Sequence, residues 1–224
     1  MDPIRVLLCN HHPIIRIGLR VLLEREPGIS IVGEAANGRE ATVLAEYKRP
    51  HVVLLDIQFS HATGIMAARE ISLKAEDVRI VFVSAHADEE YVSEGFKVGA
   101  RGYVLADSVQ TDLTRAIRVV AKGGRFLSPR VSSKLLEEPN WQCASPGKQL
   151  TENQRTLFCL LAAGYDDQEI AQNLDATFEE ARSNYETLTT SLSCFRIPEV
   201  IRSCVEWNAQ GPTIQTRHNR SNTP

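Results

Sequence analysis

The sequence of 224 residues lacks the features that would place a protein outside the cell or across a membrane. No apolar run approaches the ~20 residues that a membrane-spanning helix requires. The segment Met1-Asp2-Pro3-Ile4-Arg5 has neither the basic start nor the small-residue cleavage site of a signal peptide. We therefore expect a cytoplasmic protein that has no membrane partner.

Paired cysteines are also missing. The five cysteines are scattered and odd in number, and none forms a CxxC pair or a Cys/His cluster with zinc-site spacing. They are Cys9, Cys143, Cys159, Cys194 and Cys204. Most lie in or beside apolar segments, so we interpret them as small buried residues in a reducing compartment.

Positive charge is scarce in the C-terminal part of the chain. Residues 1–128 contain 16 Lys+Arg and 16 Asp+Glu, so this part is neutral. Residues 149–208 contain 4 arginines, no lysine and 10 acidic residues, a net charge of 4 − 10 = −6. Domains that bind nucleic acid usually carry a basic surface, so this deficit argues against strong autonomous DNA binding.

The composition that is present, 43% hydrophobic and 24% charged, is that of an ordinary globular protein with room for two modest domains. Short apolar runs that suit buried parallel strands are Arg5–Leu8, Ile29–Val32, His51–Leu55, Arg79–Val83 and Gly102–Leu105. Helical patterns follow them at Pro13–Glu26, Arg39–Lys48, Ile65–Leu73, Glu89–Val98 and Thr111–Ala121. This alternation predicts an α/β domain over residues 1–127, a doubly wound parallel sheet of five strands with its site at their carboxyl ends.

The remaining residues predict a linker and a smaller all-α domain. Residues 128–148 form the linker, with a short helix at Val131–Glu138. Over residues 149–208, capping boxes that start three helices pair Thr151 with Gln154, Asp166 with Glu169, and Thr177 with Glu180. The helices Asp167–Leu174 and Phe178–Leu192 form a helix-turn-helix, and Pro198–Trp207 forms a further helix. Residues 209–224 are polar and aperiodic, and we expect a disordered tail.

The motifs in combination resemble those of a response regulator of the NarL/FixJ type with a flavodoxin-like receiver domain. The receiver motifs are Ile4-Arg5-Val6-Leu7-Leu8, His12-Pro13, Val53-Leu54-Leu55-Asp56, Ser84-Ala85-His86, Gly99-Ala100-Arg101-Gly102-Tyr103 and Gly123-Gly124-Arg125. The C-terminal motifs resemble the LuxR-type helix-turn-helix, and they are Leu150-Thr151, Gly164 and Glu169-Ile170-Ala171. The resemblance covers roughly residues 4–207 and implies transcription regulation within two-component signalling.

The resemblance also implies a phosphorylation site, from which this chain departs. Asp56 stands at the phosphoacceptor position, Ser84 at the hydroxyl position and Tyr103 at the aromatic switch position. Two acids that help hold Mg²⁺ in the family are replaced by Asn10 and His11. A lysine that would neutralise the phosphoryl group is replaced by Ala106. The altered pocket also includes Gln58, which precedes Phe59-Ser60-His61 where the family usually has Met-Pro-Gly.

These departures remove the charges on which phosphoryl transfer depends. Mg²⁺ prefers oxygen ligands, and Asp56 is the last of the three usual carboxylates. Without the metal or the lysine, the transition state loses its electrostatic stabilisation. We therefore expect Asp56 to be inactive as a phosphoacceptor, with no resident cofactor or metal.

Three interpretations of the altered pocket remain open. In the first, Asp56 is a structural residue that is hydrogen-bonded to Asn10 or paired with His11. In the second, the strand-end crevice binds a small ligand or a partner loop. In the third, His11, His12 and Asp56 bind a transition metal, although adjacent histidines on a tight loop rarely converge on one ion.

The helix Phe178–Leu192 corresponds to the one that enters the major groove in a helix-turn-helix. Arg182, Ser183 and Asn184 are the candidate DNA-contacting residues, since Arg and Asn side chains can bind guanine and adenine edges. Basic residues that the family places nearby are absent, so DNA is a doubtful partner. Glu180 also serves as the capping partner of Thr177.

Two functions fit this sequence. The first is a transcription regulator that works without aspartate phosphorylation, as a dimer or beside another regulator. The second is an adaptor or antagonist that acts through protein contacts and has lost DNA binding. Sensing of a small ligand is compatible with either, and the sequence leaves a cognate histidine kinase undecided. No nucleophile–base pair or acid pair lies at a plausible site, so we expect no enzyme.

Overall fold

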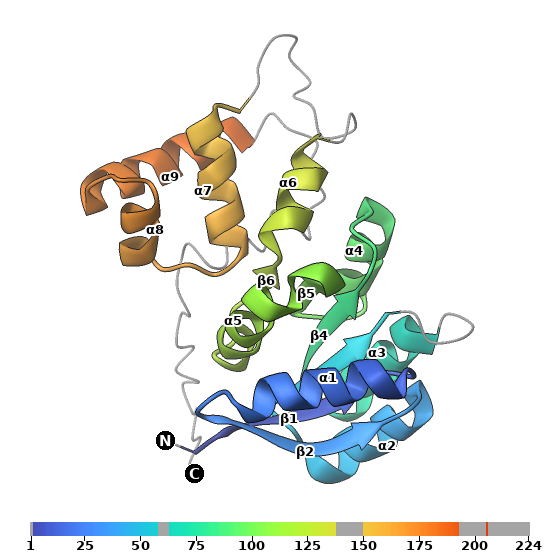
Figure 1. The fold of residues 1–224 in the computed structure, drawn as a ribbon. Coiled ribbons are helices and arrows are strands. Elements are labelled where there is room, and N and C mark those ends of the chain that lie inside the picture. The colour runs from blue at the N-terminus through green and yellow to red at the C-terminus, as the bar shows by residue number, and fades with distance from the viewer. Residues whose placement is uncertain (1, 58–62, 138–149, 193–204, 206–224) are drawn as a thin grey trace, which may run out of the picture.

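The computed structural model describes residues 2–57, 63–137, 150–192 and 205 (Figure 1). Its N-terminal part is a parallel sheet in the order β2-β1-β3-β4-β5-β6. The strands are β1 Ile4–Cys9, β2 Ile29–Ala35, β3 Val52–Asp56, β4 Arg79–Ser84, β5 Gly102–Leu105 and β6 Phe126–Leu127. The expected doubly wound α/β fold is confirmed.

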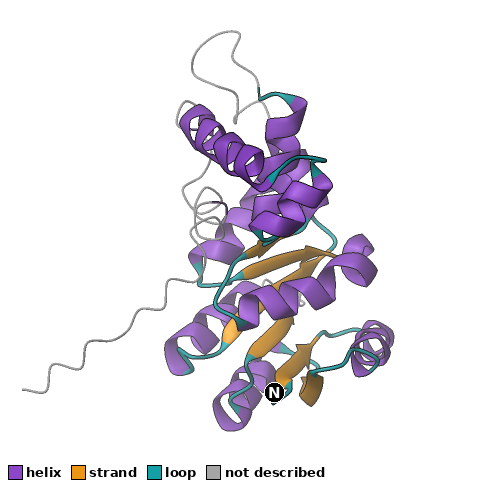
Figure 2. Cartoon of the chain, turned by 90° about the vertical axis from the view of Figure 1, so that its left-hand side faces the viewer, coloured by secondary structure: helices purple, strands orange, loops and turns teal. Residues whose placement is uncertain are grey.

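Helices cover both faces of this sheet (Figures 1 and 2). They are α1 Pro13–Glu24, α2 Gly38–Lys48, α3 Thr63–Lys74, α4 Glu89–Lys97 and α5 Val109–Ala121. Among the parts of the chain that the structure describes, no helix is both long and apolar enough to cross a bilayer.

The two faces of the sheet are assigned by the alternation of side chains along each strand. In β1, Val6 and Leu8 belong to a core shared with α1 and α5, whereas Leu7 and Cys9 belong to a core shared with α2, α3 and α4. Successive strand side chains point to opposite faces, so a strand buried on both faces must be apolar throughout. This is why the strand runs were recognisable as continuous apolar segments.

The prediction of five strands was incomplete, because a sixth strand, β6, pairs with β5. Gly102 is opposite Phe126 and Tyr103 is opposite Leu127 in parallel register. The Ser128 amide continues the pairing by donating to the Tyr103 carbonyl at 3.0 Å. Two residues are too short to give a strand-like pattern, and β6 forms because β5 offers an unpaired edge.

The C-terminal part consists of helices, as the sequence predicts. They are α7 Glu152–Ala162, α8 Asp167–Asn173 and α9 Phe178–Leu192. All three expected capping boxes are present, each with reciprocal hydrogen bonds between the N-cap residue and the residue three positions later. The predicted helix Pro198–Trp207 lies outside the described residues apart from Val205, which is helical and buried.

The helix in the predicted linker, α6 Pro129–Glu137, packs against the sheet domain instead of standing apart. Val131 and Leu135 are fully buried, and both belong to the core that also contains residues of α7, α8 and α9. Lys134 Nζ lies 2.9 Å from Asp88 Oδ1 at the start of α4. The linker helix therefore joins the two parts into one continuous core.

A second contact between the two parts joins α5 to α8. Both terminal nitrogens of Arg115 donate to the Glu169 carboxylate, at 3.0 and 2.6 Å. The Arg115 guanidinium also lies 3.7 Å from the centre of the Tyr165 ring. Nearby, Gly164 ends α7 with φ +66°, and a Cβ built there would lie 2.7 Å from Val119 of α5. Glycine is therefore required at this position for two reasons: the backbone angle is positive, and α5 approaches closely.

Candidate functional site

The residues of the altered pocket meet at the carboxyl ends of the strands. Asn10 directly follows β1, Asp56 is the last residue of β3, and Ser84 is the last residue of β4. Ala106 directly follows β5. Parallel strands end at the same edge, so these side chains from distant positions come together there.

Asp56 interacts with Asn10 and with His11, the two residues that the resemblance puts at the positions of the metal-binding acids. Asn10 Nδ2 donates to Asp56 Oδ2 at 2.9 Å. His11 Nδ1 lies 3.4 Å from the same oxygen, and the Asp56 side chain is only 12% exposed. The carboxylate is therefore mostly buried. Its Oδ2 atom, an oxygen that could accept a phosphoryl group, already has two neighbours within the protein.

The loop that carries Asn10 is fixed by further hydrogen bonds. Asn10 Oδ1 accepts from the His12 amide at 2.8 Å, and the Asn10 carbonyl accepts from Arg16 Nη1 at 2.7 Å. Arg16 Nε in turn donates to Glu34 Oε2 on β2 at 3.0 Å. Sequence reasoning missed Arg16, because a charged residue within an amphipathic helix gives no sign that it turns back to a loop.

The donor set does not fit Mg²⁺. Among the described residues, no group of three or more His, Cys, Asp or Glu side chains is placed to hold a metal ion. Asp56 is accompanied by an amide and an imidazole, and the His11 and His12 rings pack against each other with centroids 3.7 Å apart. A hard cation with near-octahedral oxygen coordination would find one carboxylate here.

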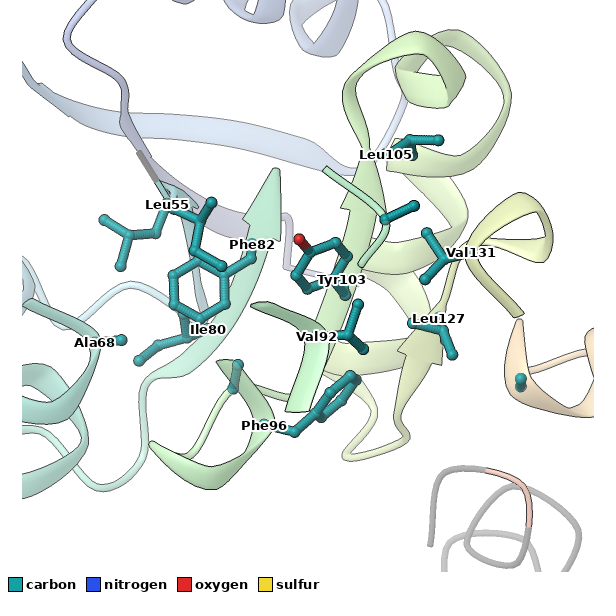
Figure 3. Packing of buried hydrophobic residues seen from close by; sticks show 14 of the residues in the cluster. Leu55, Ala68, Ile80, Phe82, Val92, Phe96, Tyr103, Leu105, Leu127 and Val131 are labelled. Atoms are coloured by element: carbon teal, nitrogen blue, oxygen red, sulfur yellow. The ribbon is translucent and has the colours of Figure 1, made fainter. Parts of the chain in front are cut away.

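Ser84 and Tyr103 hold the loop between β4 and α4. Ser84 Oγ accepts from the His86 amide at 3.1 Å, and Tyr103 Oη donates to the His86 carbonyl at 2.8 Å. Figure 3 shows the Tyr103 ring inside the core, near Phe82, Val92 and Leu127. Burial raises the pKa of Tyr103 to about 12, so the phenol stays protonated and keeps donating.

Among the described residues, the remaining pocket positions add no positively charged side chain. Ala106 is exposed at the place where the family has its lysine. Gln58 lies outside the described residues, as does the loop Phe59-Ser60-His61. Cys9, directly before Asn10, is a free buried thiol whose pKa is raised, chiefly by burial. A raised pKa keeps the thiol protonated and unreactive.

The second candidate site is the outward face of α9. Ala181, Leu188 and Leu192 are buried and attach the helix to α7 and α8, as their spacing requires. Ser183 and Asn184, where the sequence predicts DNA contacts, are exposed. Arg182 lies in α9, but its side chain is outside the described set.

Exposed acidic residues accompany these positions on α9. Glu179 and Glu186 are exposed one turn before Ser183 and one turn after it. Glu180 accepts from the Thr177 amide at 2.8 Å, and this bond is the main cause that lowers its pKa. Glu180 therefore has a capping role, while the other two carboxylates add negative charge to the outward face.

Comparisons with known proteins identify the family. Residues 6–118 match the response regulator receiver domain, which is half of the chain. The chain belongs to this family. A receiver domain therefore forms its N-terminal part.

Full-length relatives extend the likeness to the C-terminal part. The transcriptional regulatory protein LiaR of Bacillus subtilis is 31% identical over 191 residues, which is 84% of this chain and 90% of LiaR. The nitrate/nitrite response regulator NarL of Escherichia coli K12 is 34% identical over 179 residues, covering 79% of this chain and 83% of NarL. This receiver chain is accordingly a transcriptional response regulator of the NarL/LuxR family.

Solved structures agree with this fold. A LuxR-family two-component response regulator from Aurantimonas sp. SI85-9A1 has a TM-score of 0.58 at 34% identity, over 61% of this chain and 97% of that one. The response regulator RcsB in complex with DNA has a TM-score of 0.57 over 92% of this chain and 98% of its own. At 20% identity, RcsB supports the two-part fold alone.

Proposed function

We propose that this response regulator controls transcription without conventional phosphorylation of Asp56. The observation that carries the proposal is the contact of Asp56 Oδ2 with the Asn10 amide at 2.9 Å and with His11 Nδ1 at 3.4 Å. A phosphoryl group on this carboxylate would displace those contacts. It would also add negative charge, and Ala106, at the expected position of the lysine, offers no ammonium group in return.

The chemistry of transfer points the same way. Phosphoryl transfer needs positive charge around the equatorial oxygens of the transferring group, from metal ions or from Lys and Arg. Arg16, which lies close to the loop after β1, donates to the Asn10 carbonyl and to Glu34. The pocket therefore supports a structural role for Asp56, which fixes the loop after β1.

Intact-mass measurement after incubation with a small phosphodonor and Mg²⁺ tests this proposal. We expect no added phosphate on the unaltered chain. The matched control is the triple variant Asn10→Asp, His11→Asp, Ala106→Lys, which restores the family's charges and should gain an adduct on Asp56. A stoichiometric adduct on the unaltered chain would contradict the proposal.

As a transcription regulator the chain would bind DNA through α9 and associate with a second copy or another regulator. The support is the exposure of Ser183 and Asn184 on α9 and the relation to NarL and LiaR. RcsB, a more distant structural neighbour, has been solved as dimers bound to DNA. An electrophoretic mobility shift at about 50 mM salt, where phosphate contacts are strongest, should retard duplex DNA.

The acidic outward face of α9 favours a second candidate, an adaptor or antagonist that acts through protein contacts. Glu179 and Glu186 would repel phosphates on either side of Ser183. If no duplex shifts at low salt, this second function replaces the first. A small ligand in the receiver pocket is compatible with both, and would be detected as a rise in melting temperature, since binding to the folded state stabilises it.

We place the division of the chain at residues 1–127 for the receiver, 128–148 for the linker and 149–208 for the helix-turn-helix domain. The predicted tail, 209–224, lies outside the described residues. We propose a cytoplasmic location, no cofactor and no enzymatic activity of its own. A cognate histidine kinase would be dispensable if Asp56 is inactive.

A further inference from the structure

The two edges of the sheet differ in charge. The segments between each strand and the α-helix after it contain neither lysine nor arginine, and they are residues 10–12, 36–37, 57–62, 85–88, 106–108 and 128. The opposite edge, which we call the amino edge, contains 7 Lys+Arg and 4 Asp+Glu, a net charge of 7 − 4 = +3. It comprises the residues before each strand and the first two of the strand, namely 2–5, 25–30, 49–53, 75–80, 98–103 and 122–127. Because residues 1–128 are neutral as a whole, the amino edge is the positive end of the receiver.

The helix dipole explains only part of this charge. A cation is favoured at the C-terminal end of a helix, and the C-cap residues of α1, α2 and α5 are Arg25, Arg49 and Lys122. Arg101 and Arg125 hold no such position. They directly precede β5 and β6, beyond the last turns of α4 and α5. Their placement side by side therefore needs another explanation.

Arg101 and Arg125 are neighbours on adjacent strands. The Arg101 carbonyl accepts from the Phe126 amide at 2.9 Å, within the parallel pairing of β5 with β6. Tyr103 and Leu127, two positions later, belong to the core that contains the C-terminal helices, so strand alternation places both arginines on that side of the sheet. Adjacent strands are about 4.8 Å apart, and like charges at this spacing repel each other. A phosphate between the two guanidinium groups would relieve the repulsion, and its oxygens match their donor geometry.

Lys122 connects this pair to the C-terminal helices. The pKa of Glu169 is lowered chiefly by the hydrogen bond from Arg115, and the charge of Lys122 lowers it further. The exposed Lys122 therefore lies near the first turn of α8. In Figure 1 the start of β1, α8 and α9 are all on the left, and Figure 2 views the molecule from that side. The amino edge and the helix-turn-helix thus face the same direction.

The start of α8 is also where a helix-turn-helix meets the DNA backbone. The first helix of the motif crosses the backbone while the second enters the major groove. Here the first helix begins with acidic residues, Asp166, Asp167 and Glu169, which repel phosphates. Residues 149–208 contain 4 arginines and no lysine, although affinity for DNA comes mostly from cations at phosphates. Cations of the receiver beside α8 can supply what this domain lacks.

We propose that Arg101, Lys122 and Arg125, at the amino edge of the receiver, bind the phosphate backbone of duplex DNA beside the start of α8. This inference rests on the proposed function, in which α9 binds DNA, and it assigns the phosphate contacts for which α9 has few cations. The receiver and the helix-turn-helix then form one DNA-binding unit. The ion pair of Arg115 with Glu169 holds the two parts of that unit together.

Fluorescence anisotropy of a labelled duplex of about three helical turns, over a salt series, tests the proposal. Each phosphate contact contributes about 0.9 to the log–log salt slope. The double variant Arg101→Gln, Lys122→Gln should therefore lower the slope by up to about 1.8 and weaken binding at about 50 mM salt at least about fivefold. The matched control Arg39→Gln, Arg69→Gln removes the same charge from exposed positions outside the amino edge. It should leave the slope unchanged.

Two further variants separate phosphate binding from folding. Arg101→Lys, Lys122→Arg keeps both charges and should retain the salt slope. Lys122→Gln alone changes only an exposed side chain, so its melting temperature should equal that of the unaltered chain while its slope falls by about 0.9. A lower slope at an unchanged melting temperature cannot come from misfolding.

The other outcomes count against the proposal in distinguishable ways. DNA binding with an unchanged slope in Lys122→Gln and in the double variant would overturn the inference and leave the proposed function in place. Equal decreases in the double variant and its control would overturn it too, since net charge alone would then govern binding. A chain that binds no duplex at about 50 mM salt would overturn both.

The amino edge could instead attract the acidic C-terminal helices of a second copy, and sedimentation equilibrium without DNA tests this alternative. We expect Arg101→Gln, Lys122→Gln to leave the molecular mass unchanged at every salt concentration. An oligomer that forms at low salt and that this double variant dissociates would assign the edge to protein contact and overturn its assignment to DNA.

Discussion

The receiver pocket and the outward face of α9 are the two places where we propose a departure from the family pattern, and their polar residues are under different physical constraints. In the pocket, the replacing residue Asn10 is 4% exposed, and its amide and carbonyl groups contact Asp56 and His12. On α9, Ser183, Asn184, Glu179 and Glu186 are exposed. A buried site that loses its charges must satisfy its polar groups internally, whereas an exposed site can change charge at little cost.

This difference indicates which of the two proposed departures would be easier to reverse by substitution. The contact of Asn10 with Asp56 is part of the folded structure, so under our proposal the phosphorylation chemistry of the family would require several coordinated substitutions. Helix α9 is capped at Thr177 and packed on its buried side, so the DNA binding that we propose for it would depend mainly on surface charge. Four variants, from the largest expected effect to the smallest, test this contrast.

The largest effect is expected on α9 from the double variant Glu179→Lys, Glu186→Lys. Two new cations should raise DNA affinity at low salt by on the order of 100-fold and steepen the salt dependence by up to about 2 in log–log slope. Fluorescence anisotropy across a salt series measures both. The control Glu46→Lys, Glu70→Lys makes the same charge change on the receiver. Equal gains from both variants would show that net charge, and not the α9 face, governs binding.

In the pocket, Asn10→Ala should lower the free energy of unfolding by about 1–3 kcal/mol, because it leaves polar groups of Asp56 and His12 without their partner. The comparison variant Asn184→Ala on α9 should stay within about 0.5 kcal/mol of the unaltered chain. Urea denaturation of both variants gives the two values. Similar losses at the two positions would contradict the contrast between a satisfied pocket and a solvated face.

A smaller effect is expected from Tyr103→Phe, which removes the hydrogen bond to the His86 carbonyl and keeps the ring in place. The loss should be about 0.5–1.5 kcal/mol, the usual net value of one such bond. Tyr47→Phe on α2, where the tyrosine is 80% exposed, is the control and should change little. No loss for Tyr103→Phe would mean that the loop after β4 does not depend on this bond.

The smallest effect concerns the ion pair between the two parts of the molecule. Glu169→Gln keeps a residue that suits the capping box but removes the charge that faces Arg115, and should cost about 0.2–1 kcal/mol, since the pair is partly exposed. The hydrogen bond from Arg115 lowers the pKa of Glu169. A lowered folded-state pKa contributes stability above the unfolded pKa of about 4.3 that is lost as pH falls through the folded value.

The difference between Glu169→Gln and the unaltered chain should therefore be largest near neutral pH and shrink in acid. Denaturation curves at neutral pH and at successively lower pH values measure it. A difference that grew on acidification would show that the ion pair is not its source.

Much of the fold follows from local patterns. The parallel strands were visible as apolar runs because burial on both faces demands them. The starts of α7, α8 and α9 were visible as capping boxes, because each box lies within four residues. Strand β6 was not visible, since its two residues carry no period. The end of strand β2 was also missed, because the strand continues to Ala35 through Gly33 and Glu34, which are not apolar.

The candidate site was partly predictable. Asn10, Asp56, Ser84 and Ala106 were expected at one edge, because parallel strands end together. The role of Arg16 was not expected, since it depends on how α1 lies over the loop after β1. The exposure of Ile14, Ile17 and Val21 on α1 was also not expected, because these residues have the same spacing as residues that face a core.

The sequence by itself determined which segments become strands and helices, where three helices begin, and which charges are missing from the two sites. These properties depend on neighbours a few positions apart. Only the tertiary structure decided that Asn10 bonds to Asp56 across 46 positions and that Arg115 meets Glu169 across 54. Such contacts depend on the placement of the whole sheet and its helices, because no local pattern encodes the direction in which a distant side chain lies.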